Sequence, residues 1–96
     1  MALAFIMEFP GVTQQQYDQT LDRVQLGGKP YQGQLFHAAG PIAGGWCVVD
    51  VWESQEAFDR FLQAKLGQAL QEAGIPAPQP KVVSVHNMLM RERIHS

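Results

Sequence analysis

The chain has 96 residues, 46% of them hydrophobic, which fits one domain with one core because domains commonly hold roughly 100–150 residues. We therefore expect residues 1–96 to form a single domain. Nine acidic against seven basic residues give a net charge of −2, with clustered positive charge only at 91–93, so binding to a phosphate backbone is not expected.

The first elements in chain order are a strand and a helix. Residues 2–9 form an apolar run of strand length. Thr13 and Gln16 have the spacing of a capping box, which predicts that a helix starts there. Tyr17 begins the inward stripe of this helix, and glycines 27–28 are expected to end it.

A loop and a pair of strands follow. Residues 27–33 are rich in Gly and Pro and carry Tyr31, which is typical of a loop. Residues 34–39 and 46–52 have strand character, and the glycine-rich connection at 40–45 has the length of a hairpin. The two strands should therefore be an antiparallel pair.

The second half of the chain predicts a helix and a last strand. Ser54 caps a helix with a regular apolar stripe, which Gly74 ends. Gly67 inside this helix indicates a close approach of the sheet or of a partner. The proline-rich segment 76–80 is a stiff linker, and residues 81–90 are predicted to be the fourth strand.

The order strand, helix, strand, strand, helix, strand predicts the ferredoxin-like βαββαβ fold of the α+β class. In that fold two helices cover one face of a four-stranded antiparallel sheet, and the other face stays open. Since nearly every strand here is apolar on both faces, the open face would be a large hydrophobic patch, which soluble monomers rarely expose. We therefore expect a homodimer.

The third predicted strand has two unlike faces. One carries Trp46, Val48, Asp50 and Trp52, and the other carries Cys47, Val49 and Val51. The second set is small and apolar, so we expect it to face the helices. The Trp and Asp set would then lie on the open face.

A histidine on the neighbouring strand provides a candidate for catalysis. If the hairpin pairs Gly40 with Gly45, His37 lies opposite Val48 and diagonal to Asp50, at roughly 7–8 Å between Cα atoms, within reach of a side-chain hydrogen bond. A His oriented by a carboxylate can act as a general base on an aromatic substrate. We predict His37 and Asp50 as catalytic residues, with the alternative that Asp50 only satisfies a buried His.

Four further residues are predicted to contact a substrate: Trp46, Trp52, Tyr31 and His86. Aromatic residues at strand spacing are also typical of a core or a dimer contact. His86 is expected on the last strand, sharing the open face with Ser84. Because His37 and His86 would lie on opposite edges, about 14 Å apart, and no metal-binding motif is present, no metal site is predicted.

The chain resembles the dimeric α/β-barrel superfamily, and within it the antibiotic biosynthesis monooxygenase-like proteins. The residues that carry the resemblance are Gly44-Gly45-Trp46, the run 48–54, Ala57-Phe58 with Phe61, and Val85-His86-Asn87. The resemblance implies that two sheets associate into a barrel with the helices outside. It also implies a range of activities, among them cofactor-independent oxygenation of phenols and quinols and degradation of haem.

The haem-degrading members use an Asn on the first strand, where this chain has Glu8 and no Asn. Two hypotheses follow. The first is a monooxygenase-like enzyme that acts on a small aromatic phenol or quinol without a cofactor. The second is a non-catalytic dimer that binds a small apolar ligand such as haem.

The sequence also indicates where the protein resides. No stretch reaches the ~18 apolar residues of a membrane span, and the N-terminal run lacks the features of an export signal. The single Cys47 excludes an internal disulfide. We therefore expect a cytoplasmic protein without a membrane partner.

Overall fold

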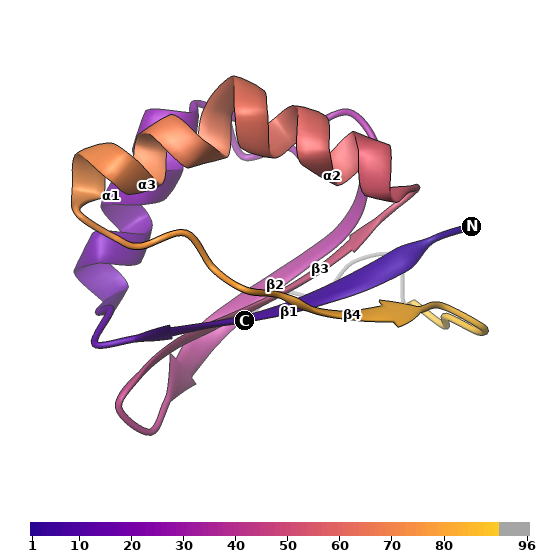
Figure 1. Ribbon diagram of the computed structural model, residues 1–96, viewed down its shortest axis with the longest axis horizontal. Coiled ribbons are helices and arrows are strands. Elements are labelled where there is room, and N and C mark those ends of the chain that lie inside the picture. Colours follow the sequence, from indigo (N-terminus) through magenta and orange to yellow (C-terminus); the bar gives the residue numbers. More distant parts are fainter. Residues whose placement is uncertain (91–96) are drawn as a thin grey trace.

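A computed structural model describes residues 1–90, and the basic stretch 91–93 lies outside the described residues. The elements in chain order are β1 (Leu3–Pro10), α1 (Gln14–Val24), β2 (Gln34–Ile42), β3 (Gly45–Trp52), α2 (Gln55–Phe61), the π-helical turn η1 (Leu62–Leu66), α3 (Gly67–Ala73) and β4 (Lys81–Ser84). Figure 1 shows α2, η1 and α3 as one continuous helical rod.

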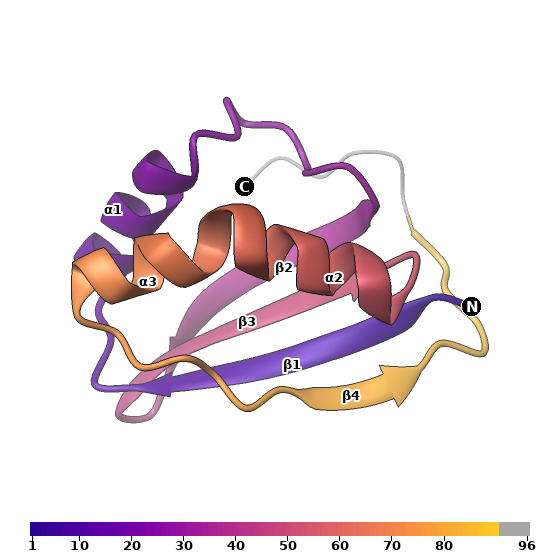
Figure 2. The same cartoon turned by 45° about the horizontal axis from the view of Figure 1, so that its top comes forward.

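The strands form one four-stranded sheet in the order β2-β3-β1-β4, and every neighbouring pair is antiparallel. Both helical segments lie over the same face of this sheet (Figures 1 and 2). The predicted ferredoxin-like α+β architecture is therefore confirmed, with β2 and β4 at opposite edges. No helix within residues 1–90 is long and apolar enough to cross a membrane.

Both helices begin at the predicted caps. The Thr13 hydroxyl accepts a hydrogen bond from the Gln16 backbone N–H, and the Gln16 side chain accepts one from the Thr13 N–H, which completes the capping box. Ser54 likewise accepts from a backbone N–H in the first turn of α2. The first helix ends before glycines 27–28, because Gln25 takes the left-handed conformation with a φ of 59°.

The second helix is interrupted by η1, where the Gly67 N–H bonds the Leu62 carbonyl. A Cβ on Gly67 would lie 2.9 Å from that carbonyl oxygen. Within the described residues the close approach predicted at Gly67 is thus to the backbone of its own helix, and not to the sheet. Phe61, just before this wider turn, and Leu66, its last residue, both line a cavity beneath the helices.

The last strand is shorter than the predicted 81–90. It ends at Ser84, and one further backbone hydrogen bond joins Val85 to the start of β1. Since β1 begins at Leu3, the residues after Val85 have no strand to pair with. His86 therefore lies on an exposed bend, and its predicted position on a strand is wrong. Ser84 pairs with Leu3, whose side chain packs against the core beneath the helices, so its predicted face is also wrong.

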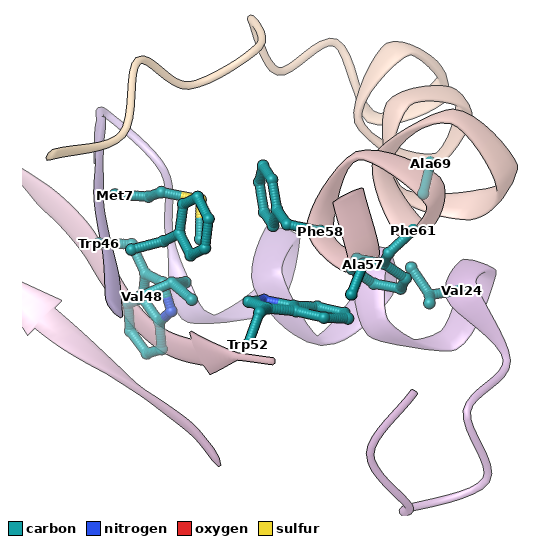
Figure 3. Packing of buried hydrophobic residues seen from close by; sticks show 10 residues of the cluster. Met7, Val24, Trp46, Val48, Trp52, Ala57, Phe58, Phe61 and Ala69 are labelled. Carbon is teal, nitrogen blue, oxygen red and sulfur yellow. The ribbon is translucent and has the colours of Figure 1, made fainter. Parts of the chain in front are cut away.

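The predicted faces of β3 are reversed. Trp46 and Trp52 are 8% and 0% exposed and pack under the helices, as Figure 3 shows, together with Phe58 and Phe61. Trp52 lies 5.1 Å from Phe61 and 5.9 Å from Phe58 between ring centroids. The physical reason is area: each Trp buries roughly 150–250 Å² against the aromatic side of the helix, more than a small aliphatic residue can. The smaller set on β3 therefore faces the open side.

The hairpin between β2 and β3 is tighter than predicted. Ile42, and not Gly40, pairs with Gly45. The register therefore moves by two residues, which keeps His37 on the same face as Asp50 but changes the residue opposite it. As a result His37 lies directly opposite Asp50.

Candidate functional site

A cavity of about 750 Å³ lies between α1, the helix-covered side of the sheet and the segment that follows α1. Its walls are mainly apolar. They include Met7, Phe9, Val12, Leu21, Val24, Leu26, Trp46, Val48, Phe61, Leu66, Leu70 and Ile75, with Tyr17, Thr20, Asp22, Gln25, Lys29, Gln34, His37 and Asp50 as polar members. The cavity has the size and apolar character of a site for a small organic ligand.

A chain of hydrogen bonds crosses one wall of this cavity. The Tyr17 hydroxyl lies 2.5 Å from His37 Nε2, and His37 Nδ1 lies 2.6 Å from Asp50 Oδ1. The other carboxylate oxygen of Asp50 accepts a hydrogen bond from Trp52 Nε1 at 3.2 Å. The expected hydrogen bond between His37 and Asp50 is therefore present, but it lies beneath the helices and not on the open face.

Each residue in this series of hydrogen bonds comes from a different secondary-structure element. Asp50 is held in the middle of β3 with its side chain 4% exposed. His37 projects from the edge strand β2 directly opposite, and its side chain is 31% exposed. Tyr17 comes from the first turns of α1 and lies nearly parallel to the imidazole, with 6.0 Å between ring centroids. All three residues line the cavity, and the Asp50 carboxylate is far more buried than the His37 imidazole.

Tyr17, the last member of this series of hydrogen bonds, is held in its neutral form. Burial raises the pKa of Tyr17 to about 12, and the negative charges of Asp50 and Asp18 add to this effect. At neutral pH Tyr17 therefore carries its proton and can donate it in a hydrogen bond.

The hydrogen-bond directions follow from the acceptor at the buried end. A carboxylate only accepts, so the Nδ1 of His37 donates to Asp50, as does the indole of Trp52. A neutral imidazole with its proton on Nδ1 has an acceptor at Nε2, and the Tyr17 hydroxyl donates to it. The site is therefore a base whose proton acceptor is oriented from behind by a carboxylate.

Trp46 forms the aromatic part of the wall beside Tyr17, with 5.3 Å between ring centroids. It lines the cavity, as expected for a substrate contact. Its indole nitrogen is buried and has no hydrogen-bond partner within residues 1–90.

The other predicted substrate contacts lie elsewhere. Trp52 is fully buried and reaches the site only through its hydrogen bond to Asp50. Tyr31 packs on Phe61 and Trp52, at 4.9 and 6.3 Å between ring centroids, and is not part of the cavity lining. His86 is exposed beyond β4, at the far edge of the sheet from His37. The structure thus gives Trp52 and Tyr31 a packing role and separates His86 from this site.

Tyr17 is the member that sequence reasoning missed as a functional residue. It is separated from His37 by 20 positions and lies on a different element, so no local spacing connects the two. Its position in the inward stripe of α1 predicted only that it packs. The part of the chain that the structure describes contains no group of three or more His, Cys, Asp or Glu side chains placed to hold a metal ion.

No protein-family model and no curated protein matches this sequence. Solved structures do share its fold. A protein from Chloroflexus aurantiacus proposed as an antibiotic biosynthesis monooxygenase is 15% identical, with a TM-score of 0.67 over 94% of this chain and 98% of its own. A cofactor-independent oxygenase from Streptomyces nogalater is 17% identical, with a TM-score of 0.61 over 94% and 98% of the two chains.

A dimeric ferredoxin-like protein of unknown function from Thermobifida fusca is also similar, at 15% identity and a TM-score of 0.64 over 88% of this chain and 92% of its own. These likenesses extend over almost the whole chain in each case. Together they show that this protein has the ferredoxin-like fold of the antibiotic biosynthesis monooxygenase-like structures.

Proposed function

We propose that this protein is a cofactor-independent, monooxygenase-like enzyme that acts on a small aromatic phenol or quinol. The observation that carries the proposal is the chain Tyr17–His37–Asp50 on the wall of an apolar cavity. The fold shared with a cofactor-independent oxygenase from Streptomyces nogalater supports it.

In the proposed reaction the site removes the proton of a phenolic hydroxyl, and the imidazole of His37 ends as an imidazolium paired with the Asp50 carboxylate. The resulting phenolate is electron-rich and can give an electron to molecular oxygen. One oxygen atom then enters the ring to form a quinone, and the other leaves as water. Phenol plus oxygen equals quinone plus water, so the balance needs no further reductant.

The cavity walls suit such a substrate. Trp46, Phe61 and Val48 offer flat and apolar contacts for an aromatic ring. A wall of low polarity also strengthens the electrostatic interaction between the anion and the imidazolium that forms with it. We therefore assign substrate contact to Trp46 and the acid–base role to His37 and Asp50.

Oxygen uptake with a panel of naphthols and quinols tests the proposal. We expect consumption by the wild type and a loss of about 10²–10⁴-fold in His37→Gln, since general base catalysis contributes that much. His86→Gln is the matched control, because it removes an exposed imidazole outside the cavity. Uptake that is equal in wild type and His37→Gln would exclude the role of His37.

We further propose that the protein is a homodimer formed through the open face of the sheet. The register of the strands places an apolar set on that face: Ala4, Ile6, Phe36, Ala38, Cys47, Val49, Val51 and Val83. Large apolar surfaces of this kind are rarely left in water. The dimeric protein from Thermobifida fusca shares the fold, which supports the dimer. The free Cys47 on this face fits the proposed location in the reducing cytoplasm.

Sedimentation at micromolar concentration tests the dimer. We expect a dimer for the wild type and single chains for Val49→Asp, because a charge would be buried in the centre of the interface. Gln68→Asp, on an exposed position of α3, is the control and should stay dimeric. Single chains for the wild type would contradict this part of the proposal.

Non-catalytic binding of a small apolar ligand in the same cavity is the second candidate, favoured by the mainly apolar character of its walls. Quenching of tryptophan fluorescence by naphthols without any oxygen consumption would support it. The haem version has less support, because both ring nitrogens of His37 are already hydrogen-bonded and His86 lies away from the cavity. A hemin titration without a saturable Soret shift would exclude haem.

A further inference from the structure

We infer that Tyr17, and not His37, takes the proton directly from the substrate, and that His37 receives only the proton that Tyr17 releases. This inference rests on the proposed function, since it assumes a phenolic ligand in the cavity. It assigns a catalytic role to a residue on α1.

The acceptor lone pair of the neutral His37 imidazole is already engaged in a hydrogen bond. Nδ1 donates to Asp50 Oδ1 at 2.6 Å, and Nε2 accepts from the Tyr17 hydroxyl at 2.5 Å. A substrate hydroxyl could reach Nε2 only by displacing Tyr17. Tyr17 is held in place by its helix and by ring contacts with His37 and Trp46 at 6.0 and 5.3 Å between centroids.

The Tyr17 oxygen can still accept a hydrogen bond. A phenol oxygen that donates one hydrogen bond keeps its lone pairs as acceptors. Tyr17 lines the cavity, so a substrate hydroxyl inside the cavity can donate to that oxygen. The Tyr17 oxygen can therefore accept a hydrogen bond from a substrate while it donates its own proton to His37.

Tyr17 cannot accept the substrate proton without His37. The pKa of Tyr17, raised to about 12 by burial and by the charge of Asp50, means that it holds its own proton at neutral pH. It can accept a second proton only if the first moves on to His37 at the same time. The carboxylate of Asp50 favours that move, because it stabilises the imidazolium that results.

This proton relay from the substrate through Tyr17 to His37 moves two protons together. The substrate O–H bond breaks and its proton bonds to the Tyr17 oxygen, while the former Tyr17 proton bonds to His37 Nε2. The substrate becomes a phenolate, Tyr17 ends neutral, and His37 becomes an imidazolium paired with Asp50. No electron is exchanged in this step.

The test separates proton transfer from oxygen chemistry by using 4-nitrophenol, whose anion has a visible absorption band and whose ring is too electron-poor to be oxidised readily. The probe is added in buffer acidic enough that it is mostly protonated when free. Binding is followed by quenching of tryptophan fluorescence. We expect the anion band to appear on binding to wild type.

The relay predicts that Tyr17→Phe still binds the probe but loses the anion band by at least about tenfold, and that His37→Gln loses it equally. The double variant should lose no more than either single variant, because the two residues act as one unit. Tyr31→Phe, the matched control, removes a hydroxyl outside the cavity and should keep the band.

An anion band in Tyr17→Phe as strong as in the wild type would overturn the inference, since proton transfer would then not need the Tyr17 oxygen. An anion band that survives in His37→Gln would overturn it as well. If the probe does not bind, both the inference and the proposed function fail. If the band behaves as expected but naphthols and quinols consume no oxygen, only the proposed function fails.

Discussion

The substitution Asp50→Asn would reverse the direction of the hydrogen-bond chain without breaking it. Asp50 accepts from His37 Nδ1 at 2.6 Å and from Trp52 Nε1 at 3.2 Å. An asparagine can keep the bond to Trp52 with its oxygen, but its NH₂ group then faces His37 Nδ1. The imidazole must move its proton to Nε2, which would point at the Tyr17 oxygen. The acceptor for a substrate proton is thereby lost.

The two expected effects differ greatly in size. Every polar group keeps a partner, so the free energy of unfolding should change by no more than about 1 kcal/mol. For a chain of 96 residues this corresponds to a shift in Tm of at most about 4–8 °C. The rate of proton removal should fall by about 10⁴-fold, the cost of the wrong tautomer in enzymes with a His–Asp base.

Urea unfolding monitored by tryptophan fluorescence measures the first effect, and oxygen uptake with the nitrophenol anion band measures the second. Asp59→Asn is the matched control, because Asp59 accepts a hydrogen bond from Gln55 on the exposed side of α2. If Asp50→Asn keeps the wild-type rate of proton removal, the direction of the hydrogen bonds along this series is irrelevant to the reaction. A loss of several kcal/mol in stability would show instead that the carboxylate charge itself holds the site together.

Three further predictions concern the tyrosine and two glycines. In the folded protein the phenolate absorbance should show Tyr17 ionising near pH 12. The folded state holds that proton more tightly than an unfolded tyrosine, whose pKa is 10.0, so the free energy of unfolding should fall as the pH rises from 10 to about 12. Ionisation of Tyr17 near pH 10 would refute its burial. Gly67→Ala would normally stabilise a helix by about 1 kcal/mol, but its Cβ would lie 2.9 Å from the Leu62 carbonyl oxygen, so we expect a loss of about 1–3 kcal/mol in urea unfolding. Gly33→Ala should cost a similar ~1–3 kcal/mol, because φ is +90° there and the new Cβ would lie 2.8 Å from that of Ala57; an unchanged Tm would show that the loop can shift.

The candidate site was only partly predictable. His37 and Asp50 share a face in any register that differs by two residues, so a hairpin of either length would keep them close. Trp46 followed from the same alternation. His86 did not join the site, because the last strand stops where β1 has no more residues to pair with.

Local sequence patterns predicted the order of the elements, the caps at Thr13 and Ser54, and the apolar alternation of the strands, because these depend on neighbours within a few residues. The side of β3 that the helices cover depends on long-range packing. Alternation defines two faces but does not rank them, and that choice depends on how the Trp side chains fit against Phe58 and Phe61. The same packing brought Tyr17 of α1 to the imidazole of His37, a contact between distant segments that no local pattern encodes.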